Sequence, residues 1–467
     1  MARPAFYTHG VFRLDRLDKA ALTVLLILAA ATGLVIARGD QIGASVTRTT
    51  PLSGAGDVST RAQISFSFSE PMNITTLEGR LQSLPPVSGT LRGNGQTVVF
   101  VPTQPLLPDT GYTLTLRAGG ESLRGRRVLG DHSVRFQTRR ARVAYLTPSE
   151  GASNLFLLDP ESAAVQRVTS EPYGVYDYAI SPDGARVVIS VNRDPNGERD
   201  LVLVNLDGSG RTVLLRCDAE VCQSASWSAD GARIAFERRA LIQRAIGKLP
   251  GPARIWLMDV STQQTVPLYA DNQRIGSLPM WSPVDDRLAF VDSTDSAITI
   301  IDTVSLEPVQ LPSNLGDPGA WSPDGNQLIF PDILPLEDRG YNQMYRVDLA
   351  RSVITTVFPI STHNDAAVAW APSGALIAFS RQEAGSRALI GAQVWLARPD
   401  GSGAHRVTSD YEYSHFRLAW SPDERWLIAQ RFKLTEQYAK PQVWLSSRDG
   451  ATQRVLAEDA TQPVWAP

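Results

Sequence analysis

Few residues in this chain have the spacing that catalysis or metal binding requires. The five histidines form no His-Glu-x-x-His pair, the pattern that places two zinc ligands on one face of a helix. The sequence contains neither a Gly-x-x-x-x-Gly-Lys phosphate loop nor a Gly-x-Ser-x-Gly nucleophile elbow. We therefore expect a non-enzymatic protein that needs no cofactor and no metal. A hydrolase or lyase built from loop residues is kept as an alternative.

The two cysteines, Cys217 and Cys222, are separated by four residues. Two thiols alone do not make the four-ligand site that zinc requires. Outside the cytoplasm, cysteines so close in sequence are able to form a short-loop disulfide. A disulfide and two free thiols therefore remain alternative predictions for this pair.

Aromatic and histidine residues gather in segments that link short apolar strands. Binding residues tend to lie on loops that a rigid scaffold holds in place. We therefore expect a binding rim for a protein, peptide or glycan partner, unless these segments are only places where insertions are tolerated. The candidates are Tyr173, Tyr176, His363, Asp365, Tyr411, Tyr413 and His415.

The elements that must position this rim follow from an internal repeat. A Trp-Ser-Pro-Asp-Gly motif or a close variant recurs at intervals of 40 to 54 residues, beginning at Ile180, Trp227, Trp281, Trp321, Trp370, Trp420 and Trp465. Ser-Pro-Asp-Gly suits a type I turn, because proline presets φ at its second position and glycine is favoured at its fourth. Apolar strands follow each turn, and four strands per repeat are typical of a β-propeller blade.

The ends of the repeat region predict how the ring closes. Trp465 belongs to a first strand that no other strands follow, whereas residues 142–168 supply a second, third and fourth strand without a first. Joining the two groups completes a seventh blade and removes the exposed sheet edges. We therefore predict an all-β chain with a seven-bladed propeller over residues 142–467, closed by strands from both ends of that segment.

The Trp-Ser-Pro-Asp-Gly repeats resemble the WD-like propeller repeats of TolB-type periplasmic proteins. That resemblance implies a role in envelope assembly or transport, which we keep as a second functional hypothesis. Two departures weaken it, because the TolB propeller has six blades and its N-terminal neighbour is of another type. The Gly-His and Trp-Asp signature of eukaryotic WD repeats is absent.

Residues 46–138 are expected to form a separate β-sandwich. Their short strands alternate apolar and polar residues, as in Gln-Ile-Ser-Phe-Ser-Phe at 63–68, and are bounded by turn residues. The stretches Ile-Ser-Phe-Ser-Phe-Ser-Glu-Pro-Met-Asn at 64–73 and Leu-Pro-Asp-Thr-Gly-Tyr-Thr-Leu at 107–114 resemble a bacterial Ig-like domain of the SbsA type. Such a resemblance implies a spacer or adhesive module.

Residues 20–37 contain no charged side chain. A helix of this length spans about 27 Å, close to the ~30 Å hydrocarbon core of a bilayer. Arg3, Arg13, Arg16 and Lys19 precede it, so the positive-inside rule predicts a cytoplasmic tail at residues 1–19 and an extracytoplasmic remainder. A cleaved signal peptide is the competing interpretation.

The charge of the chain argues against nucleic-acid binding. Its net charge is −3, and no long run of basic residues provides the patch that phosphate backbones require. Only four of the 45 basic residues are lysines. The excess of arginine fits either a GC-rich genome or a surface adapted to bidentate contacts with anions.

Within a propeller blade, successive turns alternate between two faces. The Ser-Pro-Asp-Gly turns and the Asp-Gly hairpin turns fall on one face, which we call the tight-turn face. The long segments between second and third strands, together with the links between blades, fall on the other, the long-loop face. All seven rim candidates are expected on the long-loop face.

Overall fold

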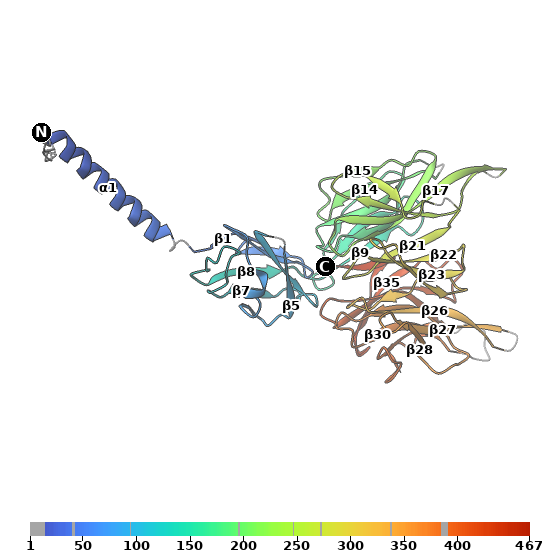
Figure 1. Ribbon diagram of the computed structural model, residues 1–467. Coiled ribbons are helices and arrows are strands. Elements are labelled where there is room, and N and C mark those ends of the chain that lie inside the picture. Colours follow the sequence, from blue (N-terminus) through green and yellow to red (C-terminus); the bar gives the residue numbers. More distant parts are fainter. Residues whose placement is uncertain are drawn as a thin grey trace, which may run out of the picture.

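The structure is a computed structural model, and it describes residues 15–39, 43–93, 95–194, 197–245, 247–270, 273–336, 339–383 and 391–467. One long helix comes first, a β-sandwich follows, and a ring of small sheets makes up the remainder (Figure 1). The chain is therefore all-β apart from this helix and one short 3₁₀ turn, η1 (Ile74–Thr76).

Helix α1 (Arg16–Gly39) contains the uncharged segment. Its stretch from Arg16 to Leu34 has a mean hydropathy of 1.7 and is not buried against the rest of the protein. This helix is long and apolar enough to cross a membrane, and an N-terminal signal sequence has the same length and composition. Residues 1–14 of the predicted cytoplasmic tail lie outside the described residues.

Two four-stranded sheets form the sandwich. Alternating residues point into one core, which includes Ile64, Phe66, Leu114 and Val134. The first sheet has the order β1 (Val46–Thr50), β3 (Ile64–Phe68), β6 (Thr97–Pro102), β5 (Gly89–Gly93), and the second the order β2 (Ala55–Val58), β8 (His132–Thr138), β7 (Gly111–Leu116), β4 (Leu81–Leu84).

The described strands after the sandwich form five four-stranded sheets and one nine-stranded sheet, in which a single bridge between Arg199 and Val221 joins two blade-like units. Divided at that bridge, they make seven units, an arrangement compatible with the predicted seven blades. The closing blade has the order β37 (Thr461–Ala466), β9 (Arg142–Thr147), β10 (Asn154–Leu158), β11 (Val165–Arg167). Blade 2 contains β12 (Val175–Ile180), β13 (Arg186–Asn192), β14 (Arg199–Asn205) and β15 (Thr212–Leu215). Blade 3 contains β16 (Glu220–Trp227), β17 (Arg233–Arg244), β19 (Arg254–Asp259) and β20 (Thr265–Pro267), and β18 (Gly247–Pro250) extends β17 as a hairpin.

The remaining four blades follow in chain order. Blade 4 contains β21 (Gly276–Trp281), β22 (Arg287–Asp292), β23 (Ala297–Asp302) and β24 (Pro308–Pro312). Blade 5 contains β25 (Ala320–Trp321), β26 (Gln327–Leu336), β27 (Arg339–Asp348) and β28 (Val353–Thr356). Blade 6 contains β29 (Asn364–Trp370), β30 (Ile377–Gln382), β31 (Gln393–Ala397) and β32 (His405–Arg406). Blade 7 contains β33 (Tyr413–Trp420), β34 (Trp426–Lys433), β35 (Gln442–Ser447) and β36 (Gln453–Glu458).

The repeated motif performs two structural tasks. In blade 2 the Ser181 hydroxyl donates to the Asp183 carboxylate at 2.6 Å, the Gly184 N–H donates to the Ser181 carbonyl at 2.8 Å, and Gly184 has φ of 64°. The tryptophan then joins neighbouring blades, because the indole N–H of Trp227 donates to the Ala179 carbonyl of the preceding blade at 2.9 Å. Equivalent bonds join four further pairs of blades, from Trp321, Trp370, Trp420 and Trp465.

The closing blade combines both ends of the propeller segment. Strand β37 pairs with β9 in antiparallel register, with Trp465 opposite Val143 and Val464 opposite Ala144. Trp465 is buried, and its indole N–H donates to the Ala419 carbonyl of blade 7 at 3.3 Å. The ring is therefore closed by hydrogen bonds between residues more than three hundred positions apart.

The sandwich packs against the tight-turn face of the propeller. The Arg139 guanidinium donates to the Gly184 carbonyl in the first turn of blade 2 at 3.0 Å. A Cβ on Gly184 would lie within 3.1 Å of Ser59 in the sandwich and within 2.5 Å of Pro467 in the closing blade. The long-loop face, where β17 and β26–β27 project, consequently points away from the sandwich (Figure 1).

Candidate binding face

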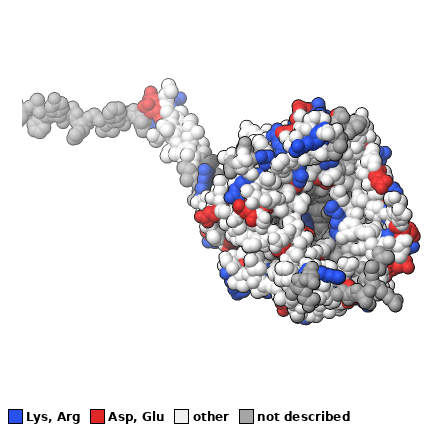
Figure 2. All heavy atoms as spheres, turned by 90° about the vertical axis from the view of Figure 1, so that its right-hand side faces the viewer, with Lys and Arg blue, Asp and Glu red and all other residues white. Residues whose placement is uncertain are grey.

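The long-loop face surrounds the opening of the propeller ring. Viewed from this side, the molecule has a hollow near its centre, and arginine or lysine side chains lie at the edge of the hollow (Figure 2). The first strands of the blades line this hollow, because they are innermost in each sheet. Side chains at the ends of these strands that reach the long-loop face are therefore placed to contact a ligand.

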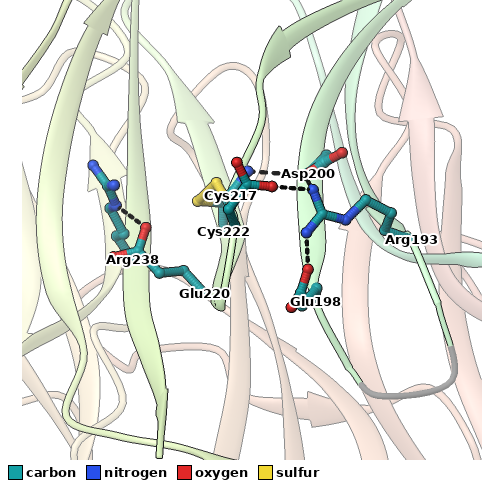
Figure 3. Close-up of a disulfide and its surroundings, with 8 residues drawn as sticks. Arg193, Glu198, Asp200, Cys217, Glu220, Cys222 and Arg238 are labelled. Atoms are coloured by element: carbon teal, nitrogen blue, oxygen red, sulfur yellow. Dashed lines mark hydrogen bonds and ion pairs between the residues drawn. A yellow bond between two sulfur atoms is a disulfide. The ribbon is translucent and has the colours of Figure 1, made fainter.

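Cys217 and Cys222 form a disulfide, so the disulfide prediction is confirmed and the free-thiol alternative is wrong. Both residues are buried; Cys217 lies in the link between blades 2 and 3, and Cys222 lies in β16, the first strand of blade 3 (Figure 3). The Cys217 N–H donates to Asp200 Oδ1 at 2.8 Å, and Glu220 accepts from Arg238 at 2.5 Å on the other side of the bridge. This bridge holds one segment of the long-loop face in a fixed conformation.

Arg193 adds an ion-pair network beside the disulfide (Figure 3). Its guanidinium contacts the carboxylates of Glu198, Asp200 and Asp218. The Asp218 contact, at 2.5 Å, raises the pKa of Arg193 above its ordinary value, despite some desolvation. The basic charge of Arg193 is thus neutralised within the protein and is not available to a ligand.

Tyr173 and Tyr176 are exposed on the long-loop face, as the rim prediction requires. Their side chains are 48% and 43% exposed. The guanidinium of Arg199 lies 3.6 Å above the ring of Tyr176, a distance typical of a cation–π contact. An arginine thus immobilises one of the predicted rim tyrosines and presents its own charge beside it.

Tyr411 and Tyr413 lie at the start of the first strand of blade 7. Tyr411 is 36% exposed, and its hydroxyl accepts from Arg406 and donates to Glu383 at 3.4 Å. Tyr413 is half-buried beneath Arg431, whose guanidinium lies 4.0 Å from its ring centroid. Tyr176 and Tyr413 therefore have the same environment, an inner-strand tyrosine covered by an arginine.

Two candidates are not rim residues, and the prediction that they face a ligand is corrected here. Asp365 and His415 are each only 1% exposed. They belong to β29 and β33, because both strands begin earlier in the sequence than the loop assignment assumed. His363 is half-buried, and its carbonyl accepts from Gln343 Nε2 at 3.2 Å.

Asp365 has a structural partner. Its two carboxylate oxygens accept from Nε and Nη2 of Arg381 at 2.7 and 2.8 Å. Burial raises the pKa of Asp365, and the bidentate contact with Arg381 opposes that rise. Arg381 in turn lies over the rings of Phe358 and Trp395. The pair is a packed element of blade 6.

His415 is held in the neutral form. Its Nδ1 lies 3.1 Å from the Ala392 carbonyl, and its ring contacts the Trp444 indole edge-to-face at 5.0 Å. Burial, with a smaller contribution from nearby Arg431, lowers the pKa of His415 to about 4. Its Nε2 is buried and has no hydrogen-bond partner within the described residues.

The residue-by-residue prediction missed the arginines that cover the rim tyrosines. Arg199 donates to Asn192 Oδ1 at 2.8 Å and to Gln223 Oε1 at 2.5 Å. Arg431 donates to Gln442 Oε1 at 2.9 Å. For Arg431 the available signal was an arginine that follows the apolar segment of a second strand, as at Arg238 and Arg381. Arg199 begins the third strand β14, and this pattern does not predict it. Within the described residues, no cluster of three or more histidine, cysteine, aspartate or glutamate side chains is placed to hold a metal.

Comparison with known proteins identifies the sandwich and finds solved structures that resemble the chain at low identity. The family model of the bacterial Ig-like domain matches residues 40–138, which confirms the expected module. No curated protein matches the chain. Solved structures with a similar fold include an oligogalacturonate lyase in complex with manganese, at 17% identity and a TM-score of 0.48, covering 64% of this chain and 83% of that one.

Two further solved structures are similar at low identity. TolB from Acinetobacter baumannii is 15% identical, with a TM-score of 0.43 and 83% coverage of each chain. A prolyl endopeptidase is 12% identical, with a TM-score of 0.48, covering 76% of this chain and 49% of that one. Similarity at this level concerns the fold alone, because one propeller fold carries several unrelated functions.

Proposed function

We propose that this protein is a membrane-tethered, extracytoplasmic binding or scaffold protein without enzymatic activity. In this proposal α1 is an uncleaved anchor with a cytoplasmic N-terminus, and the Ig-like sandwich is a spacer of the SbsA type. The propeller then presents its long-loop face to a protein, peptide or glycan of the cell envelope.

The packing of the sandwich against the tight-turn face is the observation that carries this proposal. Arg139 is largely buried between the two domains, where it contacts Asp57 at 3.8 Å and the Gly184 carbonyl at 3.0 Å. A helix anchored in the membrane, followed by this sandwich, directs the tight-turn face toward the bilayer. The long-loop face, with its exposed tyrosines, is then the surface open to a partner.

The disulfide supports an extracytoplasmic location independently of α1. A disulfide between Cys217 and Cys222 persists in oxidising compartments and is rare in the cytosol. The resemblance of the repeats to TolB-type propellers favours the envelope as the site of action, and an accessory role in envelope assembly or transport is the second candidate function.

A crosslinking pull-down from native membranes tests the proposal. Tyr176→Ala and Tyr411→Ala remove exposed rings from the long-loop face, and Val304→Ala removes an exposed apolar side chain from a turn on the opposite face. All three melting temperatures should stay close to that of the unaltered protein, because surface substitutions change stability by about 0.5 kcal/mol or less. We expect the tyrosine variants to lose partner capture and Val304→Ala to retain it. Equal capture by all variants would reject the long-loop face as the binding surface.

The anchor has its own test. The mass of the N-terminal peptide of protein purified from membranes distinguishes a retained helix from a cleaved one. A mature N-terminus near Thr32 would rule out the anchor and leave an exported protein without a tether.

A further inference from the structure

In blade 6 an arginine, Arg381, lies near the end of the second strand β30, on the side of the long-loop face. Arg381 lies directly opposite Asp365 in the antiparallel register of β29 and β30. The two side chains form a bidentate ion pair, and Arg381 is only 8% exposed. The charge of Arg381 is therefore satisfied within the blade.

Blade 7 has the same arginine without the carboxylate. Arg431 occupies the position equivalent to Arg381, and its directly opposite residue in β33 is His415. Arg431 donates through Nε to the neutral amide oxygen of Gln442. The nearest acidic influences on Arg431 come from Asp410 and Glu458, and neither forms an ion pair with it within the described part of the chain.

The imidazole that replaces the carboxylate does not balance this charge. His415 is neutral at physiological pH because its burial opposes protonation. A buried ring nitrogen without a partner costs free energy, and native structures contain few of them. Within the described residues, the Arg431 guanidinium has no carboxylate partner and the nearby His415 Nε2 has no hydrogen-bond partner. A ligand could supply polar contacts at this position that the protein's own side chains do not.

A second arginine of the same kind lies on the other side of the closing blade. Arg199 donates to two neutral amide oxygens and covers Tyr176, as Arg431 covers Tyr413. The buried Asp177 acts on Arg199 electrostatically, but within the described residues it forms no ion pair with Arg199 and instead accepts from Ser190 and Ser224. Gln462 of β37 connects the two sites, because its N–H donates to Gln430 Oε1 at 2.8 Å and its side-chain amide donates to the Tyr176 carbonyl at 2.9 Å.

Five other arginines of the long-loop face differ from this pair. Each has a carboxylate within ion-pair distance, so their charge is neutralised by the protein. These are Arg193, Arg238, Arg239, Arg274 and Arg381. Arg199 and Arg431 are half-buried, and burial lowers the pKa of both, so an anion that displaces water from them gains a strong contact.

We propose that Arg431 and Arg199 form a receptor site for a carboxylate-bearing ligand on the long-loop face. The ligand supplies to Arg431 the charge that Asp365 supplies to Arg381 in blade 6. A carboxylate matches the planar fork of a guanidinium, and blade 6 contains that geometry. This inference deepens the proposed function, since it names the chemistry that the long-loop face recognises. Free organic acids and acidic side chains of a peptide both carry this group.

Calorimetric titration of the full chain in detergent tests the site with two probes. One probe is glutarate, and the other is a short glutamate-containing peptide compared with its glutamine counterpart. We expect a carboxylate probe to bind, and Arg431→Gln and Arg199→Gln each to weaken binding at least tenfold. Arg425→Gln changes an exposed arginine in a turn on the tight-turn face and should leave the affinity unchanged. If the glutamate peptide binds and glutarate does not, the recognised carboxylate belongs to an acidic peptide. If only glutarate binds, it belongs to a small organic acid.

The most discriminating variant is His415→Asp, which introduces into blade 7 a carboxylate equivalent to that of Asp365 in blade 6. The new Asp is expected to pair with Arg431 as Asp365 pairs with Arg381, so carboxylate binding should be lost while the melting temperature is kept. Unchanged affinity in folded His415→Asp or in Arg431→Gln would overturn the proposal, as would binding that Arg425→Gln weakens equally. If His415→Asp fails to fold, Arg431→Gln and Arg431→Lys decide the question.

The same variants separate this inference from the proposed function. If His415→Asp still captures the crosslinked partner and no carboxylate probe binds the unaltered protein, the carboxylate site is refuted and the binding face stands. If carboxylates bind but all long-loop variants capture the same partners, the site is supported and the proposed partner-binding role is rejected.

Discussion

Closure of the ring by β37 makes the stability of the whole propeller depend on a few residues. Deleting residues 463–467 removes the pairing of Val464, Trp465 and Ala466 with β9 and leaves β9 as an open sheet edge. Trp465 is buried and bonded to blade 7, so the loss of its side chain alone is expected to cost about 3–5 kcal/mol.

The expected size of the effect follows from a matched residue. Trp420 occupies the same position in blade 7, is equally buried and bonds to Ala369 of blade 6. Trp465→Ala and Trp420→Ala should therefore destabilise the protein by similar amounts. The deletion should cost more than either, about 5 kcal/mol or above, because it also removes backbone pairing.

Thermal unfolding followed by circular dichroism measures these differences. For a domain of this length, 1 kcal/mol corresponds to a shift of about 1.5 °C in Tm, so the deletion should lower Tm by about 7 °C or more. Limited proteolysis should also cut the deletion variant near β9, where the edge is exposed. A deletion variant that melts within about 1 °C of the full chain would refute closure by β37.

Three further outcomes test the interior of the propeller. Asp365→Asn should lower the free energy of unfolding by about 3–5 kcal/mol in chemical denaturation, because it leaves Arg381 buried without its carboxylate, and a loss below about 1 kcal/mol would contradict the pairing. The folded-state pKa of His415, about 4, lies below its unfolded value near 6.5, so its contribution to stability is fully present above about pH 6.5 and is lost as the pH falls toward 4. That loss is about 3 kcal/mol in urea titrations, and His415→Gln should flatten this part of the pH profile. Replacing Cys217 and Cys222 with serine should cost about 2 kcal/mol from loop-closure entropy, and dithiothreitol should reproduce the effect in the unaltered protein but not in the variant.

Much of the architecture is predictable because blades are built from local signals. Ser181, Asp183 and Gly184 lie within four consecutive residues and make the turn among themselves. Tryptophan heads six of the seven motifs, and it is large and apolar, so it packs between blades for the reason that places such residues in any core. Five of the six are buried and Trp370 is partly buried. The repeat also predicts the mixed closing blade, since counting strands at its two ends leaves one blade incomplete.

The candidate site was predictable only in part. Tyr176 and Tyr411 are exposed, as the rim prediction requires, although Tyr176 lies in strand β12 and not in a loop. Asp365 and His415 were assigned to loops, although each lies inside a first strand opposite an arginine. Composition and turn signals do not reveal that β29 and β33 begin two and three residues earlier than expected, and a shift of this size changes which side chains are buried.

The amino-acid sequence determines the blade repeat, the turns and the apolar helix, because each depends on residues within a few positions of one another. It leaves open which arginines have carboxylate partners, because that depends on the register between strands and on residues tens of positions apart. Asp365 pairs with Arg381 across two strands. Only the folded ring reveals that, within the described part of the chain, Arg431 and Arg199 have no such ion pair and lie on either side of Gln462. The direction of the binding face is likewise tertiary, since it follows from the contact of Arg139 with Gly184 between two domains.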